Sequence, residues 1–414
     1  MKINKHTLSN GLRIVHSKNE STSMVCLNLM YLVGARDEDP EHTGFAHLFE
    51  HLMFGGTENF PNFDEPIQLA GGTNNAWTSS DVTNYYITIP KQNVEIALCL
   101  ESDRMRSLAF SEESLEVQRK VVIEEFKQRS LNQPYGDFNA LIRDLSYSVH
   151  PYRWSVIGKD PSHIENATME QVKEFFFKYY APNNAILSVT GNIEMEELVG
   201  LVERWFGDIP QRSLSQRQLP QEPLRENIRR AEVFRDVPTP MICMTHLMPS
   251  LYEKDFVVCD LISDILANGK SARLKKYERD PLLCTSIDAY VEDRLDKGLF
   301  FIVARPAEGV SLEEIEAVIE KEIQQLQTDL IGEYELQKLQ NKHESAVAIN
   351  NLDYMELASQ LAKYEIVGDA NKVNDLVESY NKVTPEQIRR VAQLLFNPNN
   401  RNVLYYKTNA MKEK

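Results

Sequence analysis

The second half of this 414-residue chain repeats the order of patterns found in the first half. An apolar stretch over 25–32, a helix-like segment ending in glycines and an apolar run over 83–90 recur as 241–247, 255–266 and 298–306. Near the end of each half, a Thr-x-Glu-Gln segment precedes a Pro-Asn-Asn turn. Such self-similarity indicates two divergent copies of one α/β unit.

The elements of this unit follow from hydrophobic periodicity. Strand-like runs in the first half cover 8–15, 25–32, 83–90 and 185–190, and helical periodicity covers 94–106, 112–129 and 169–180. The segment 211–229 is rich in Gln, Ser, Arg and Pro and predicts a linker. We therefore expect one domain over 1–210 and a homologous domain over 230–414.

Composition narrows the class of protein. With 42% hydrophobic and 26% charged residues the chain is typical of a globular protein, and no apolar run reaches the roughly 20 residues of a membrane span. The start of the chain lacks the apolar core of a signal peptide, so we expect a cytoplasmic protein, or a periplasmic one if the true N-terminus was removed. A formal charge of −16 disfavours nucleic acid as a partner. The scattered cysteines predict neither a disulfide framework nor a cysteine metal site; they are Cys26, Cys99, Cys243, Cys259 and Cys284.

The segment His47-Leu48-Phe49-Glu50-His51 carries the strongest chemical signal. In a helix, His47 and His51 are four residues apart and share one face, so two imidazoles can hold one zinc ion while Glu50 reaches a water on it. The alternative is a pair of buried, hydrogen-bonded histidines without a metal. His42 precedes the expected helix and is interpreted as a surface or capping residue. The corresponding helix of the second copy has no histidine, so we expect one zinc ion per chain.

A catalytic zinc needs a third protein ligand and an open position. On the helix over 112–129, periodicity places Glu125 inside the inward arc and Glu124 at its edge. An inward carboxylate needs a cation, which a zinc ion or an arginine could supply. The residues that define this arc are Leu115, Val121, Val122 and Phe126.

Together these features resemble the pitrilysin/insulinase (M16) family of zinc peptidases, in its branch of short two-domain subunits that includes the beta subunit of the mitochondrial processing peptidase. The likeness runs in order through nearly the whole chain. Its positions are His47-x-x-Glu50-His51, Asn75-Ala76-x-Thr78, Thr83-x-Tyr85, Arg119-x-Val121-Val122-x-Glu124-Glu125, Tyr180-x-Pro182-x-Asn184 and Gly191.

The resemblance implies an α+β fold in which each domain is a mainly antiparallel sheet with helices packed on it. It implies a zinc endopeptidase for peptides or unfolded segments, with His47, His51 and Glu125 as zinc ligands and Glu50 as general base. The strand carrying Asn75, Ala76 and Thr78 would be the edge on which the substrate is added in extended form.

Two departures from the family pattern bear on function. Gln118 stands where a supporting glutamate is common, seven residues before the third ligand. In the second half, Glu278 and Thr285 stand where active single-chain members carry an Arg and a Tyr that hold substrate, with Arg279 one position off and no tyrosine before Tyr290. We therefore expect a heterodimer whose homologous partner subunit supplies that pair, with a homodimer as second choice.

Two other functions stay open. The first is a non-catalytic structural or binding subunit of the same fold, although such a scaffold has no need of the complete set of metal-binding residues. The second is a zinc hydrolase for a small non-peptide substrate, which the edge strand over 75–86 disfavours because it suits an extended chain.

Overall fold

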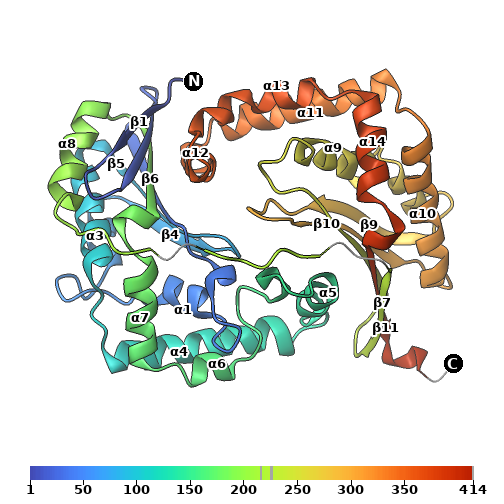
Figure 1. Ribbon diagram of the computed structural model, residues 1–414, viewed down its shortest axis with the longest axis horizontal. Helices are drawn as coiled ribbons and strands as arrows, with labels where there is room; N and C mark the ends of the chain where they lie inside the picture. Colours follow the sequence, from blue (N-terminus) through green and yellow to red (C-terminus); the bar gives the residue numbers. More distant parts are fainter. Residues whose placement is uncertain (215–216, 224–226, 413–414) are drawn as a thin grey trace. The chain divides into compact units, whose positions relative to one another are not determined.

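The structure, a computed structural model, describes residues 1–414 except 215–216, 224–226 and 413–414. The chain forms two compact units, each built on one sheet (Figure 1). Unit 1 contains 1–127, 154–219 and 346–376, and unit 2 contains 128–153, 220–345 and 377–414. The continuous ranges expected from the sequence, 1–210 and 230–414, therefore differ from the units in space. Segments 128–153 and 346–376 each join the unit built mainly from the other half.

The sheet of unit 1 has the order β1-β2-β6-β3-β5-β4. All neighbouring strands are antiparallel except the parallel pair β2 and β6, and β4 lies at a free edge. Its strands are β1 Asn4–Thr7, β2 Arg13–Lys18, β3 Met24–Tyr31, β4 Thr73–Thr78, β5 Thr83–Pro90 and β6 Ala185–Gly191.

The sheet of unit 2 has the order β7-β11-β8-β10-β9 and repeats the pattern β2-β6-β3-β5-β4. It begins with a parallel pair, β7 and β11, and continues with antiparallel neighbours. Matching order and matching strand directions confirm the α+β class and the internal duplication. Its strands are β7 Arg229–Arg235, β8 Met241–Leu247, β9 Cys284–Val291, β10 Leu299–Pro306 and β11 Arg401–Thr408.

Helices cover both faces of the unit 1 sheet. One face carries α1, α3 and α8, with α4 and α7 packed against α1, and the other face carries α12 (Figure 1). The helices are α1 Phe45–Leu52, α2 Asp64–Leu69, α3 Val94–Arg106, α4 Glu112–Phe126, α6 Ser162–Glu165, α7 Met169–Tyr179, α8 Met195–Phe206 and α12 Tyr354–Ile366.

The unit 2 sheet is covered in the same way. Helices α9, α10, α11 and α14 share one apolar core, and α5 packs on the opposite face, against β7, β8 and β11. The helices are α5 Phe138–Ser146, α9 Phe256–Ala267, α10 Leu312–Thr328, α11 Glu333–Asn350, α13 Leu376–Asn381 and α14 Pro385–Leu395. Thus α5 and α12 are the elements by which each half of the sequence contributes to the other unit.

Several sequence predictions need correction. The strand expected over 8–15 is wrong in its first part, because residues 8–12 form a turn and the strand is β2. In this turn the N–H of Leu8 donates to the backbone oxygen of Leu12, the N–H of Gly11 donates to that of Leu8, and Gly11 has φ +88°. The apolar Leu8 and Leu12 are core residues that flank this turn, which periodicity mistook for a strand. The elements that were not predicted are strands β1, β7 and β9 and helices α2, α5, α6, α8, α12 and α13.

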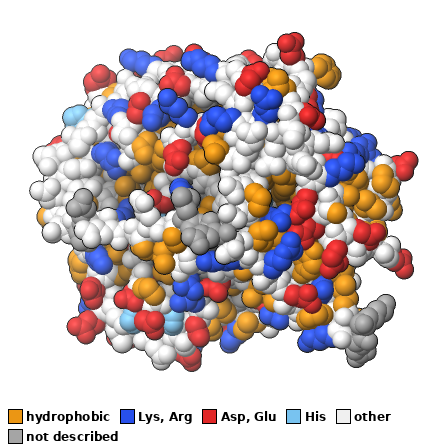
Figure 2. Space-filling model, turned by 45° about the vertical axis from the view of Figure 1, so that its right-hand side comes forward, with side chains coloured by type: hydrophobic (Ala, Val, Ile, Leu, Met, Phe, Trp, Pro, Cys, Tyr) orange, Lys and Arg blue, Asp and Glu red, His pale blue; other side chains and the backbone are white. Residues whose placement is uncertain are grey.

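The linker predicted over 211–229 includes residues outside the described part of the chain. Its described residues 211–214 and 217–223 form no helix or strand, and β7 begins at Arg229. Among the described residues, no helix is both long enough and apolar enough to cross a membrane. The cytoplasmic location stays a prediction. On the face shown in Figure 2, basic and acidic side chains are interspersed.

Candidate metal centre

Helix α1 begins at an unusual N-terminus. Gly44 has φ +93°, and a Cβ there would lie 3.0 Å from the backbone oxygen of Ile157, so glycine suits this position. The N–H groups of Gly44 and Ala46 donate to the two carboxylate oxygens of Glu38, each at 2.9 Å. Burial raises the pKa of Glu38 to about 8, against the opposing effect of these hydrogen bonds. Glu38 thus satisfies the first amides of the helix, a role that the sequence alone did not indicate.

The apolar face of α1 is fixed by aromatic packing. The Phe49 ring stacks on Phe175 and Tyr180, with centroid distances of 5.2 and 5.1 Å. The hydroxyl of Tyr85, on β5, donates to the backbone oxygen of Phe49 at 3.2 Å. Because these contacts hold the helix against its own sheet, the polar residues of its other face have fixed positions.

His47, His51 and Glu125 converge. One potential ligand atom from each of the three residues lies within 4.8 Å of the others, the only such group of three among the described residues. The Oε2 atom of Glu125 lies 3.6 Å from His47 Nε2 and 3.3 Å from His51 Nε2. Zinc–ligand distances of about 2.0–2.2 Å in a tetrahedron require donor atoms about 3.3–3.6 Å apart. The residues therefore fit a zinc ion in both chemistry and spacing.

Helix α4 presents Glu125 to the histidines and turns Glu124 away. The side chain of Glu125 is 19% exposed, whereas that of Glu124 is 61% exposed and pairs with Lys127 at 2.5 Å. The inward arc expected from periodicity holds for Leu115, Val122 and Phe126, which are buried. It is wrong for Val121, which is 45% exposed, because α1 and the neighbouring core cover a narrower part of α4 than expected.

Helix α4 is anchored at its N-terminus and near its middle. The Ser111 hydroxyl accepts a hydrogen bond from the N–H of Ser114 and caps the helix N-terminus. The guanidinium of Arg119 donates to the backbone oxygens of Ile164 and Ala167, at the end of α6 and just beyond it. These bonds fix the position of α4 within unit 1 and thus the position of Glu125.

Glu50 contacts the edge strand β4. Its Oε2 atom accepts a hydrogen bond from the hydroxyl of Thr78 at 2.6 Å. On the same strand, the N–H of Ala76 donates to the side-chain oxygen of Asn75 at 2.8 Å, and Asn75 is exposed. The structure therefore brings Thr78 to Glu50, a contact that the motif did not suggest, while Asn75 and Ala76 lie on the free edge of the sheet.

Two other candidate residues lie apart from the three donors. Gln118 is half-buried two turns before Glu125 on α4, and within the described residues it forms no hydrogen bond to the donors, so its supporting role stays a prediction. His42 is exposed, and its ring lies 3.0 Å from the side-chain nitrogen of Gln171. It lies outside the donor group.

The second copy places a hydrogen-bonded network where the first places its donors. Aligning Gly56, which follows α1, with Gly269, which follows α9, matches the two histidines with Asp260 and Asp264. His343 Nε2 lies 2.9 Å from the Asp264 carboxylate, which also accepts from Lys342 at 2.8 Å. The Tyr380 hydroxyl donates to Asp260 at 2.6 Å. These carboxylates are already paired with protein donors, in keeping with one metal site per chain.

The positions expected to hold substrate in the second half have other partners. Glu278 accepts hydrogen bonds from Lys275 and from the N–H of Ile287, both at 2.8 Å. Thr285 is exposed and donates to the backbone oxygen of Arg305 at 3.3 Å. Tyr290 stacks on Phe301 with a centroid distance of 4.8 Å. Neither Glu278 nor Thr285 has the cationic or phenolic group of the family pair.

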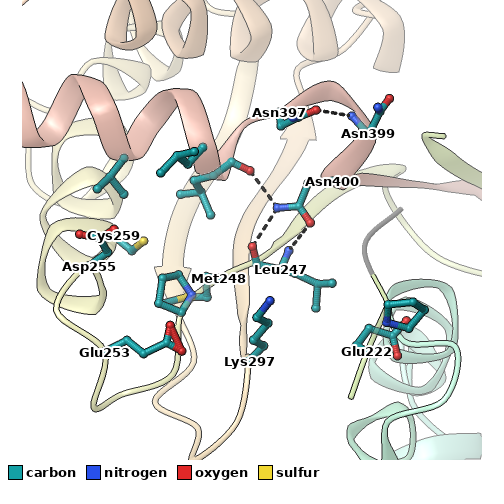
Figure 3. Close-up of a pocket in the computed structure, with 15 residues that line it drawn as sticks. Glu222, Leu247, Met248, Glu253, Asp255, Cys259, Lys297, Asn397, Asn399 and Asn400 are labelled. Atoms are coloured by element: carbon teal, nitrogen blue, oxygen red, sulfur yellow. Dashed lines mark hydrogen bonds between the residues drawn. The ribbon is translucent and has the colours of Figure 1, made fainter. Parts of the chain in front are cut away.

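Unit 2 contains a separate cavity of about 370 Å³. Met248 and Cys259 contribute to its apolar wall, and the polar Asn400 lies at its side (Figure 3). The Asn400 amide is committed, because it donates to the backbone oxygens of Leu247 and Leu395 and accepts from the N–H of Leu247. None of the described lining residues is a predicted site residue.

Comparison with protein-family models gives two matches. The family described as "Insulinase (Peptidase family M16)" matches residues 13–145, and the family described as "Peptidase M16 inactive domain" matches residues 166–342. The first range contains His47, Glu50, His51 and Glu125.

Similar proteins carry protease names. The chain is 28% identical over 410 residues to "Zinc protease PqqE" of Helicobacter pylori, which covers 97% of this chain and 92% of that protein. It is 23% identical over 398 residues to "Uncharacterized zinc protease YmxG" of Bacillus subtilis, covering 95% and 96%. The crystal structure of a protease from Helicobacter pylori superposes with a TM-score of 0.92 at 28% identity, covering 98% of this chain and 99% of that chain.

Proposed function

The chain belongs to the M16 (insulinase) family of peptidases, and on this premise we propose that it is the zinc-bearing subunit of an endopeptidase that cleaves peptides or unfolded segments. The observation that carries the proposal is the convergence of His47, His51 and Glu125 beside Glu50. An array of two imidazoles and one carboxylate leaves a position open, as catalytic zinc sites require.

The residues of this chain divide the chemistry among them. When bound by His47, His51 and Glu125, zinc supplies a Lewis acid for the scissile carbonyl and for an attacking water. Glu50 accepts the proton of that water and delivers it to the leaving amine. The free edge of β4 holds the substrate in extended form, and a substrate carbonyl replaces the Asn75 side chain as acceptor for the N–H of Ala76.

The variant Glu50→Gln tests this assignment. It keeps the size of the side chain and removes the base, so we expect stoichiometric zinc in both proteins and peptide hydrolysis lowered by about 10²–10⁴-fold in the variant. Metal content would be measured by elemental mass spectrometry and cleavage by chromatography of an unstructured peptide. Zinc-dependent activity that survives Glu50→Gln would overturn the role of Glu50. Absence of zinc from the wild-type chain would overturn the peptidase itself.

We also propose that a homologous partner subunit completes the enzyme. The proposal is supported by Glu278 and Thr285, which stand where the family pattern has an Arg and a Tyr. The chain alone should bind zinc and cleave slowly, and a partner carrying the pair should restore cleavage. Full activity of the isolated monomer, established by sedimentation and kinetics in one buffer, would exclude the partner. Full activity of a dimer of this chain alone would instead support the homodimer.

A non-catalytic binding subunit is the second candidate function. The same two residues favour it, since a chain without the substrate-holding pair could retain peptide binding and lack turnover. Peptide binding without zinc, and without cleavage in the presence of any homologous subunit, would select this function.

A further inference from the structure

We propose that Thr78 is a positioning residue for the general base, resting on the function proposed above: its hydroxyl holds the Glu50 carboxylate in one orientation. The 2.6 Å distance from Thr78 Oγ1 to Glu50 Oε2 lies in the range of a charge-assisted O–H···O⁻ hydrogen bond. The Thr78 hydroxyl donates to only one of the two carboxylate oxygens of Glu50, Oε2. Among the described residues Oε1 accepts no hydrogen bond, which leaves it available for the proton of the attacking water.

The backbone of Thr78 is itself rigid. Thr78 is the last residue of β4 and pairs with Thr83 of β5 across a tight turn. The turn is closed by a hydrogen bond from the N–H of Ser79 to the oxygen of Val82, at 2.8 Å. Because the strand register and the turn together fix this backbone, the hydroxyl is presented from a fixed point.

A second segment clamps the same turn. The N–H groups of Ala35 and Arg36 donate to the backbone oxygens of Ser79 and Ser80, at 3.2 and 2.9 Å. The buried side chains of Arg36 and Asp81 form an ion pair at 2.8 Å. A Cβ at Gly34 would lie 2.5 Å from the Ser80 backbone, so the two segments are in close contact. The Glu50 carboxylate, by contrast, ends a side chain with three rotatable torsions. Its orientation is therefore set by the rigid Thr78.

This geometry couples the base to the strand that receives the substrate. Thr78 and Ala76 belong to one strand, so a peptide added at the edge of β4 is aligned with the element that orients Glu50. The hydroxyl donates to Oε2 whether Oε1 is ionised or carries a proton, so the contact persists through both proton transfers. Such preorganisation acts on turnover rather than on substrate binding.

The variants Thr78→Val and Thr78→Ser test the proposal, with Thr7→Val as the matched control. Thr7 is an exposed strand threonine on β1, at the edge of the same sheet opposite to β4, and its side chain forms no hydrogen bond among the described residues. We expect Thr78→Val to lower kcat by about tenfold or more with KM changed less than about twofold, because orientation and not binding is lost. Thr78→Ser should retain kcat within about threefold, since it keeps the donor. Thr7→Val should behave like the wild type.

A structural readout accompanies the kinetics. Crystal structures of the metal-free proteins should show one Glu50 carboxylate orientation in the wild type and Thr78→Ser, and several in Thr78→Val. An unchanged kcat in Thr78→Val, or a single unchanged Glu50 orientation in it, would overturn the proposal. A raised KM with unchanged kcat would assign Thr78 to peptide binding instead. If the wild type cleaves nothing, the proposed function fails while the crystal structures still decide the role of Thr78. Thr78→Ser keeps the test open if Thr78→Val does not fold.

Discussion

Two adjacent glutamates of α4 have opposite surroundings. Glu125 faces the imidazoles of His47 and His51, and Glu124 is exposed and paired with Lys127. Both carry the same charge on the same helix, so they form a natural pair of substitutions. Their difference separates the effect of removing a ligand from the effect of removing a charge.

We predict that Glu125→Gln weakens zinc binding by at least about 100-fold, since even the loss of a residue that only supports a ligand costs 10–100-fold. Glu124→Gln should bind zinc like the wild type. Affinity would be measured by competition with a chromophoric chelator at constant pH. Equal loss in both variants would indicate a general charge effect and would exclude Glu125 as a specific ligand.

Individual residues show what hydrophobic periodicity can and cannot predict. It separates Glu125 from Glu124 correctly because one residue step rotates the side chain by about 100° around a helix. It misplaces Val121 because the width of the covered arc depends on the neighbouring elements, which periodicity does not contain. It could not indicate Glu38, whose role depends on a turn that returns the chain to the start of α1.

At the scale of elements, helices α9 and α11 of unit 2 correspond to α1 and α4 of unit 1. The first pair is joined by contacts of Lys342 and His343 with Asp264, whereas the second pair presents the metal-binding groups. Burial alone would raise the pKa of Asp264, but hydrogen bonds from His343 and Lys342 outweigh burial and hold this pKa below its ordinary value. A carboxyl group whose pKa is lower in the folded state than in the unfolded state stabilises the fold at every pH above its unfolded-state pKa. That contribution disappears as the pH falls through the folded-state pKa.

We therefore predict that Asp264→Asn lowers the free energy of unfolding at pH 7 by roughly 1–3 kcal/mol, the usual contribution of hydrogen bonds to charged groups. The difference in unfolding free energy between the variant and the wild type should shrink as the pH falls from about 4, the ordinary pKa of Asp, through the lower pKa of Asp264 in the folded state. Denaturant unfolding at several pH values measures it. The exposed Asp329→Asn provides the control. A difference that grows in acid would contradict this account.

At the scale of the whole molecule, the chain crosses between its units. Helix α12 comes from the second half of the sequence and packs on β3 and β6, which come from the first half. Leu361 is fully buried in this contact with Val15, Met30 and Ile186. The stability of unit 1 therefore depends on a segment far beyond the range 1–210.

We predict that Leu361→Ala destabilises unit 1 by about 2–5 kcal/mol through lost burial and a residual cavity. Hydrogen exchange should show faster exchange in β3 and β6 and unchanged exchange in β8 and β10. Leu352→Ala, at a position 77% exposed, should leave both sheets unchanged. Faster exchange confined to unit 2 would mean that α12 contributes its stability there.

The sequence by itself determined the duplication, most strands, the helices α1, α3, α4, α7 and α9, and the placement of His47, Glu50 and His51 on one short helix, because these depend on spacing within a few residues of chain. It also placed Glu125 correctly on the inward face of α4. Only the tertiary structure decided that Thr78 meets Glu50, that Glu38 closes the start of α1, and that α5 and α12 cross between units. These contacts join residues distant in sequence or separated by turns, and their partners are set by how sheets and helices pack rather than by any local pattern.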